Sequence, residues 1–166
     1  MSDSQGVGPA EASNSPVAGV RQRFAPLVVE DASDQAPLIE RAFRRAGLPI
    51  LLPILTDVRD VVGFLEGSGK FADPSRFYPK ASFLLVGVAA PRRAGFDVVT
   101  TVRARTEWDT FPIVVLSRTR EKKDLYRAYD LGANSYLEVP DTFDGLVETV
   151  RTLVGYWTLL NCGAKL

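Results

Sequence analysis

The stretch SFLLVGVAAPRRAG, residues 82–95, decides how this chain folds. Residues 82–88 are an apolar run that is too short for a helix, so they predict a buried strand. The Ala, Pro, Arg and Gly residues that follow are typical of a loop. At the junction of strand and loop stands Gly87, which has no side chain that can react. We therefore expect a strand that leads to a functional edge with an empty position at its end.

The rest of the chain repeats this alternation of short apolar runs and amphipathic segments. The apolar runs predict five strands, over 25–29, 50–55, 82–88, 111–117 and 135–139. The amphipathic segments predict five helices, over 33–47, 57–67, 95–105, 119–132 and 142–160. Because parallel neighbours need crossover connections, this order predicts an α/β fold with a doubly wound, five-stranded parallel sheet.

Turn and capping residues mark the ends of several elements. The expected helix caps and stops are Ser33 or Asp34, Thr119, Gly47 and Gly132. Pro53 has no amide hydrogen, which predicts an edge position for the strand at 50–55.

Composition limits the function classes. The 166 residues are 46% hydrophobic and carry 20 basic and 20 acidic side chains, as expected for one soluble globular domain. Zero net charge gives no sign of a nucleic-acid or membrane partner, and the absence of histidine excludes histidine-based catalysis and histidine metal ligands. A single cysteine, Cys162, favours a reducing cytoplasm. We expect a disordered tail over 1–23, a domain over 24–160 and a short tail over 161–166.

Parallel α/β sheets place their functional sites at the carboxyl ends of the strands. The residues that the predicted strands deliver to this edge are Glu30, Asp31, Gly87, Ser117, Arg118, Val139 and Pro140. They are the candidate site.

Several segments resemble a CheY-like response-regulator receiver domain, in the expected order and spacing. These are LVVED (27–31), VAAPRRAG (88–95), IVVLS (113–117), YDLGANSYL (129–137) and the proline at 140. The segment GKFADPSR (69–76) and the pair YW (156–157) are similar to the short receivers that partner bacterial phytochromes. The resemblance implies a flavodoxin-like (βα)5 fold with strand order 2-1-3-4-5.

Two residues that the resemblance makes essential are missing. Gly87 stands where the family has the aspartate that accepts phosphate, and Val139 stands where it has a paired lysine. Glycine supplies no nucleophile for an aspartyl phosphate. Because one negative and one positive charge are lost together, the net charge of the pocket is unchanged, which indicates a settled rearrangement.

Other residues match the family pattern. Glu30 and Asp31 match its magnesium-holding acids, Ser117 its switch hydroxyl and Tyr136 its switch aromatic, whereas Arg118 replaces a small residue. Each of these residues also has a simpler explanation without a functional role. Glu30 and Asp31 can be solvated loop residues that bind magnesium weakly or not at all. The Ser117 hydroxyl can bond only to backbone groups, and the Tyr136 ring can serve only in packing.

Three functions remain, in decreasing order of support. The first is a pseudo-receiver, a non-enzymatic binding module without a cofactor that recognises a signalling protein such as a histidine kinase or a phytochrome. The second is a phosphorylatable receiver that uses Ser117 or Asp31 as acceptor. The third is a nucleotide or small-ligand binder, which the acids of VVEDASD (28–34) disfavour because a phosphate site needs amide donors there.

We also expect a homodimer. The face made by the fourth helix, fifth strand and fifth helix offers mixed charges for two-fold pairing, and the end of the last helix adds apolar area. The interface residues are Lys122, Lys123, Arg127, Asp130, Glu138, Tyr156, Trp157 and Leu160.

A last hypothesis concerns the empty position. Arg118 is long enough to lie above Gly87, where its guanidinium would hold Glu30 or Asp31. The alternative is an Arg118 side chain that points into solvent.

Overall fold

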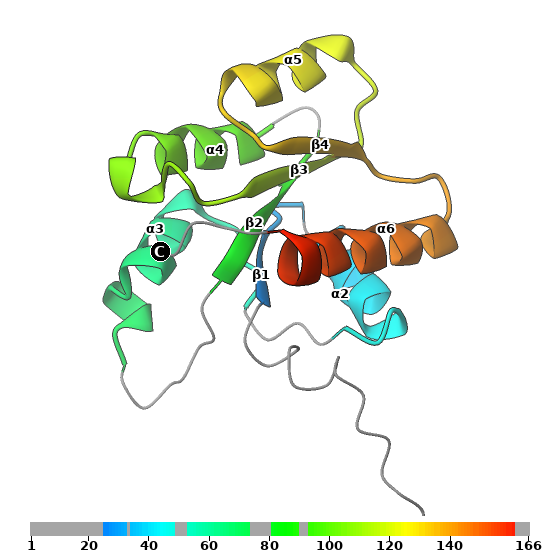
Figure 1. The fold of residues 1–166 in the computed structure, drawn as a ribbon, viewed down its shortest axis with the longest axis horizontal. Helices are drawn as coiled ribbons and strands as arrows, with labels where there is room; N and C mark the ends of the chain where they lie inside the picture. The colour runs from blue at the N-terminus through cyan, green and yellow to red at the C-terminus, as the bar shows by residue number, and fades with distance from the viewer. Residues whose placement is uncertain (1–24, 33, 49–52, 74–80, 90–92, 162–166) are drawn as a thin grey trace, which may run out of the picture.

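A parallel sheet of four strands forms the middle of the fold (Figure 1). The computed structural model describes residues 25–32, 34–48, 53–73, 81–89 and 93–161. The strands lie in the order β1-β2-β3-β4 and span Ala25–Val29, Ala81–Val88, Ile113–Ser117 and Ser135–Glu138. The helices are α2 (Ala36–Arg45), α3 (Val58–Glu66), α4 (Gly95–Arg103), α5 (Lys122–Asp130) and α6 (Phe143–Gly155). Short helical turns lie at η1 (Gly69–Phe71) and η2 (Thr106–Trp108), and a π-helical segment, η3 (Tyr156–Leu160), extends α6.

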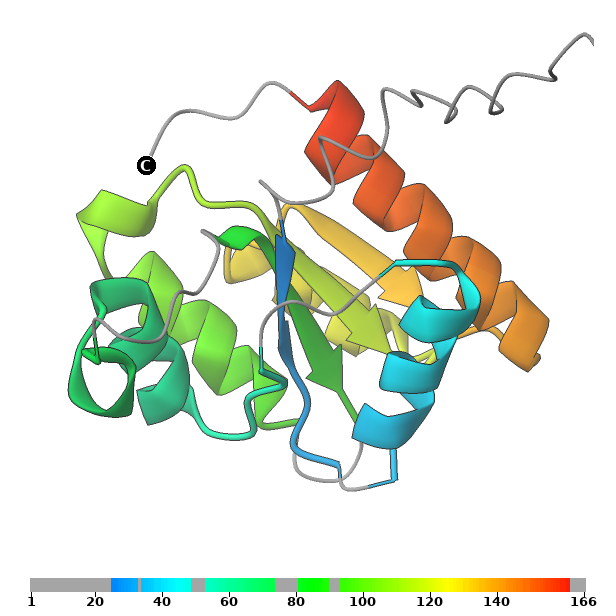
Figure 2. The same ribbon diagram turned by 90° about the horizontal axis from the view of Figure 1, so that it is seen from below.

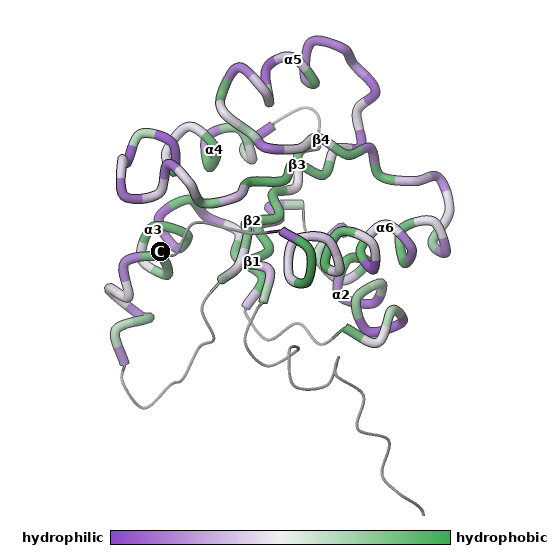
Figure 3. The backbone as a smooth tube through the Cα atoms, viewed as in Figure 1, coloured by the Kyte–Doolittle hydropathy of each residue, from purple (hydrophilic) through white to green (hydrophobic). Residues whose placement is uncertain are grey.

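Helices cover both faces of this sheet. Figures 1 and 2 show α3, α4 and α5 on one face and α2 and α6 on the other. Successive strand residues point to opposite faces, so Leu84 and Val86 of β2 join the core under α3 and α4, whereas Phe83 and Leu85 join the core under α2 and α6. Figure 3 shows β2 and β3 as largely hydrophobic segments in the middle of the fold. The doubly wound α/β class is therefore confirmed.

The expected second strand, over 50–55, is not a full strand. Within the described residues it is one parallel bridge between Leu55 and Val29, in which the Leu55 amide donates to the Val28 carbonyl (2.9 Å). Pro53 cannot donate a hydrogen bond, which limits pairing on this edge, and residues 49–52 lie outside the described part. Among the described residues the sheet therefore has four strands and not the predicted five, and the Leu55 bridge places the 50–55 segment beside β1, as the order 2-1-3-4-5 expects.

Glycines end the helices where the sequence predicts. Gly47 and Gly132 follow α2 and α5 with φ of +72° and +95°, which side chains rarely adopt. In α6, Leu146, Val150 and Leu153 are buried and form its core-facing stripe.

The expected helix caps are wrong. Gln35 precedes α2 and Glu121 precedes α5, and neither side chain makes a capping hydrogen bond. Asp34 instead accepts a hydrogen bond from the Gln35 side chain, and the Thr119 hydroxyl is used elsewhere. Ser33 lies outside the described residues.

The predicted tails lie almost wholly outside the described residues, and Cys162 lies there too. Within the described part, no helix has the length and apolar character needed to cross a membrane.

Candidate functional site

Glu30 occupies the space above Gly87. Val29 pairs with Val86 across the two strands, so Glu30 and Gly87 are the next neighbours at the carboxyl edge of the sheet. A Cβ atom added to Gly87 would lie 1.9 Å from Glu30 Oε2 and 2.6 Å from its Cδ. The position that lacks a side chain is therefore filled by the carboxylate of the adjacent strand.

This carboxylate is held in a poorly solvated position. Glu30 is 5% exposed, and its Oε1 accepts a hydrogen bond from the Ala32 amide (3.0 Å). Burial raises the pKa of Glu30, and the neighbouring Asp31 and Asp34 carboxylates raise it further. The Ala32 amide and the Arg118 guanidinium lower the pKa without cancelling the effect of burial. Glu30 is thus an inward-turned acid that binds its proton more tightly than a free glutamate.

A second glycine brings the first turn of α4 onto the same strand. A Cβ atom on Gly95 would lie 2.2 Å from the Gly87 carbonyl oxygen and 2.8 Å from side-chain atoms of Val86 and Val88. The helix can reach this depth only because Gly95 has no side chain. One glycine makes room for a carboxylate, and the other makes room for a helix.

Arg118 does not fill the space above Gly87, so that hypothesis is wrong. Its guanidinium pairs with Asp34 at 3.8 Å, and the Arg118 side chain is 52% exposed. No ion pair joins it to Glu30 or Asp31, all three of which the structure describes. The reason is steric, because the Glu30 carboxylate already occupies the place that the guanidinium would need.

A small cavity separates Glu30 from the position of the missing lysine. Its volume is about 10 Å³, room for one water molecule, and its lining includes Glu30, Gln35, Arg118 and Val139. The Val139 amide donates to the Ser117 carbonyl (2.7 Å), so the strand end is fixed although its side chain is apolar. Pro140 follows, half-buried, beside the first turn of α6.

Asp31 faces a different cavity from Glu30. Together with Gly87, Asp57 and Asp97 it lines an acidic hollow of about 190 Å³ between β1 and the starts of α3 and α4. Within the described residues, no three acidic, histidine or cysteine side chains come close enough to hold a metal ion. The two acids therefore do not fit the magnesium clamp that the resemblance implies, because Glu30 turns onto Gly87 and lines a different cavity from Asp31.

Ser117 and Tyr136 meet through the loop after β3. The fully buried Ser117 hydroxyl lies 3.2 Å from the Val88 carbonyl, to which it donates, and accepts a hydrogen bond from the Thr119 amide (3.1 Å). The Tyr136 hydroxyl donates to the Thr119 carbonyl (3.0 Å). Both switch-like side chains thus hold backbone groups of neighbouring segments.

Two charged residues that sequence reasoning missed stand beside this loop. Arg93, before α4, donates through Nε to both carboxylate oxygens of Asp124 on α5 (2.9 and 3.0 Å). Asp124 is 2% exposed and also accepts a hydrogen bond from the Thr119 hydroxyl (2.6 Å). The available signal was spacing, because Asp124 stands four residues before the core residue Ala128 and so shares its buried face.

The predicted interface residues divide between two faces of the sheet. Lys122, Lys123, Arg127 and Asp130 lie exposed on α5, where the Arg127 guanidinium also stacks on the Phe96 ring. The remaining residues belong to β4 and the end of α6, and these are Glu138, Tyr156, Trp157 and Leu160. Trp157 is half-buried against Phe83, whereas Leu160 is 73% exposed. A groove of about 660 Å³ runs between β4 and α6 beside Tyr156 and Trp157.

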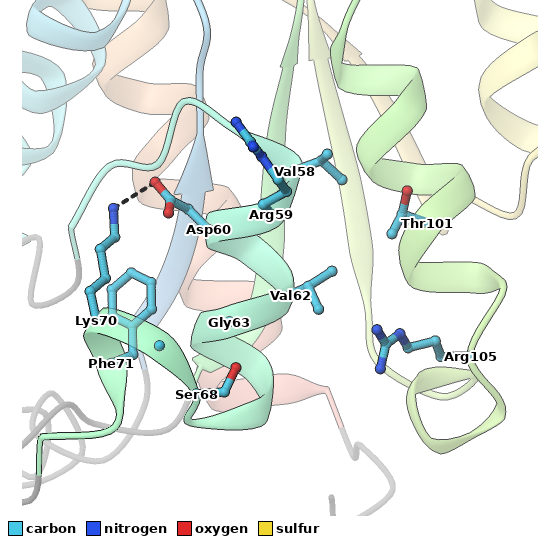
Figure 4. Close-up of a pocket in the computed structure, with 11 residues that line it drawn as sticks. Val58, Arg59, Asp60, Val62, Gly63, Ser68, Lys70, Phe71, Thr101 and Arg105 are labelled. Atoms are coloured by element: carbon cyan, nitrogen blue, oxygen red, sulfur yellow. Dashed lines mark hydrogen bonds and ion pairs between the residues drawn. The ribbon is translucent and has the colours of Figure 1, made fainter.

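A further cleft, of about 410 Å³, lies between α3, η1 and α4, away from Gly87 (Figure 4). Its cations are Arg59, Lys70 and Arg105, and each forms an ion pair, as the Lys70 to Asp60 contact in Figure 4 illustrates. Because these charges are already compensated, the cleft is not a prepared anion site.

Comparison with known proteins finds three informative relatives, although no family model matches the chain. The chain is 33% identical over 137 residues to the probable methanogenesis regulatory protein FilR2 of Methanothrix harundinacea, which covers 81% of this chain and 83% of that protein. The crystal structure of response regulator RPA3017 in red light signaling of R. palustris matches with a TM-score of 0.74 and 26% identity, over 87% of this chain and 99% of that chain. The bacteriophytochrome response regulator RtBRR matches with a TM-score of 0.61 and 27% identity, over 85% and 84% of the two chains.

Proposed function

Because the chain belongs to the response-regulator receiver family, we propose that it acts in signal transduction by binding a protein partner without being phosphorylated. It works as a recognition module and not as an enzyme. The observation that carries this proposal is the position of Glu30 Oε2, 1.9 Å from where a side chain at Gly87 would begin.

The chemistry of the edge supports the loss of phosphorylation. An aspartyl phosphate needs a carboxylate nucleophile with open space in front of it and a cation to hold the product. Gly87 offers no nucleophile, Val139 offers no cation, and Glu30 takes the space. The carboxylate of Glu30 is not a substitute nucleophile, since it is buried and accepts a hydrogen bond from Ala32.

The two other hypotheses have weaker support. The Ser117 hydroxyl is fully buried and engaged with the Val88 carbonyl, so a phosphodonor cannot reach it in this arrangement. Asp31 is half-buried in the acidic hollow, where two further carboxylates repel an incoming phosphate. The same carboxylates disfavour a nucleotide.

The relatives suggest the kind of partner. Two of them are named for red light signalling or bacteriophytochrome, so the proposed partner is a cytoplasmic signalling protein such as a histidine kinase or a phytochrome. Homodimerisation through α5, β4 and the end of α6 is part of the proposal. The exposed Leu160 and the groove beside Tyr156 supply apolar area for it.

Intact mass spectrometry after treatment with a small phosphodonor and magnesium tests the function. The wild-type chain is expected to gain no phosphoryl group, whereas a receiver with an ordinary acceptor aspartate, treated in parallel, gains one.

A phosphoryl adduct on the wild-type chain would overturn the proposal. Two variants would then identify the acceptor, because Asp31→Asn and Ser117→Ala each abolish the adduct only if the replaced side chain carries it. Tryptic mapping of the adduct gives the same answer independently.

A further inference from the structure

A continuous chain of polar contacts joins four segments around the loop after β3. It runs from the Val88 carbonyl through the hydroxyls of Ser117 and Thr119 to the Asp124 carboxylate, and ends at Arg93. The end of β2, the loop after β3, the first turn of α5 and the residues before α4 are thereby tied together.

The hydroxyl proton of Thr119 has a definite direction. A carboxylate only accepts, so Thr119 gives its proton to Asp124, at 2.6 Å. The Thr119 oxygen then only accepts at its other contact, so the single Ser117 proton is shared between the Thr119 oxygen and the Val88 carbonyl, each 3.2 Å away. Asp124 is therefore the acceptor that fixes the Thr119 hydroxyl.

Arg93 holds that acceptor from the opposite side. Its side chain is 20% exposed, and besides Asp124 it reaches Glu121 through Nη2 (3.1 Å). Burial alone raises the pKa of Asp124, but the hydrogen bonds from Thr119 and Arg93 reverse the effect and lower it, so the carboxylate stays ionised at neutral pH.

The backbone of Arg93 adopts an unfavourable conformation to make this contact. Its φ is +50°, and among the described residues no other non-glycine side chain stands in the left-handed region. The Arg93 amide donates to the Ala89 carbonyl (2.9 Å) and its carbonyl accepts from Phe96, which fixes the turn before α4. Such strain persists only where the surrounding contacts compensate for it.

We propose that the Arg93 to Asp124 pair is an internal latch that holds the loop after β3 and the start of α5 in one arrangement without a phosphoryl group. The inference rests on the proposed function, because it explains how a receiver that is never phosphorylated presents a constant surface to its partner. Tyr136 belongs to the latched set through its bond to the Thr119 carbonyl.

Nuclear magnetic resonance of the full chain, without phosphodonor, tests the latch. In the wild type, the amides of residues 117–124 are expected to show one state without relaxation dispersion. Arg93→Gly removes the guanidinium and relieves the positive φ, so it folds readily but frees the loop. It should produce dispersion in these residues and at least about tenfold faster hydrogen exchange of the Thr119 amide, whose bond to Ser117 depends on the loop.

Asp124→Asn is the second variant, since it keeps the shape of the side chain and removes its charge. Asp141→Asn is the matched control, because it breaks the exposed pair with Arg120, which stems from the same loop, and is expected to leave the dispersion unchanged. The latch proposal would be overturned if the wild type and Arg93→Gly showed equal relaxation dispersion in residues 117–124. It would also be overturned if neither Arg93→Gly nor Asp124→Asn showed any dispersion there. A phosphoryl adduct on the wild type overturns only the proposed function, so the two failures are distinguishable.

Discussion

Replacing Gly87 with alanine tests directly whether Glu30 fills the empty position. The new methyl group would lie 1.9 Å from Glu30 Oε2, so the carboxylate must retreat by more than about 1.5 Å to reach ordinary contact distance. The obstacle is the end of a flexible side chain, and the fold should survive. Alanine in a strand gains about 0.5–1 kcal/mol over glycine. Loss of the bond from the Ala32 amide costs about 1 kcal/mol. Below about pH 4.5, where Glu30 carries its proton in both the folded and the unfolded chain, these terms nearly offset each other, and the free energy of unfolding should change by less than about 1 kcal/mol.

The pH dependence of stability carries the sharper prediction. Because burial raises the pKa of Glu30 above its ordinary 4.5, Glu30 keeps its proton to a higher pH in the folded wild type than in the unfolded chain. The wild type therefore loses stability as pH rises from about 4.5 through the pKa of folded Glu30. In Gly87→Ala the expelled carboxylate titrates normally, and this loss disappears. Urea unfolding between pH 4 and pH 8 should show that the free energy of unfolding of the variant increases relative to that of the wild type as pH rises. If the free energies of unfolding of the variant and the wild type depend on pH in the same way, Glu30 is not held above Gly87.

Three further predictions concern the first turn of α4, the small cavity beside Glu30 and the proposed dimer. Gly95→Ala should lower the free energy of unfolding by about 1–3 kcal/mol in urea titrations, because the new Cβ would lie 2.2 Å from the Gly87 carbonyl oxygen, and this clash outweighs alanine's helix preference. Unchanged stability would mean that α4 does not pack this closely on β2. Val139→Lys places an ammonium group in the small cavity beside Glu30, so the pKa of Glu30 should fall. Urea titrations at pH 5 and pH 7 should then show the variant gaining stability relative to the wild type at the higher pH. Leu160→Ser should weaken the proposed homodimer at least about tenfold in sedimentation analysis, since it removes an exposed apolar side chain, and a wild type that is monomeric at high micromolar concentration would contradict the dimer itself.

The sheet and its covering helices could be predicted from the apolar runs. The run at 25–29 coincides with β1, and the run at 82–88 differs from β2 by one residue. These strands are buried on both faces, so their composition alone identifies them. The edge segment at 50–55 was harder, because a run containing Pro53 has the apolar residues of a strand without its full set of donors.

The sequence predicts which residues lie at the carboxyl edge of the sheet, but it does not predict the contacts between them. The sequence places Glu30 and Gly87 at the same edge, but the inward turn of Glu30 depends on the register of β1 against β2 and on one rotamer. Arg118 was expected in a space that another side chain had already taken. The contact between Arg93 and Asp124 joins residues 31 positions apart, and no local pattern reports such a pair.

The filled position above Gly87 also bears on the evolutionary reversibility of this receiver. A single return to aspartate would bring a new carboxylate against Glu30 Oε2, with no cation at Val139 to separate the two charges. Such an ancestor-like intermediate is disfavoured before it can regain any chemistry. The inward turn of Glu30 therefore favours a compensating change, at Glu30 or at Val139, in any return to an acceptor aspartate.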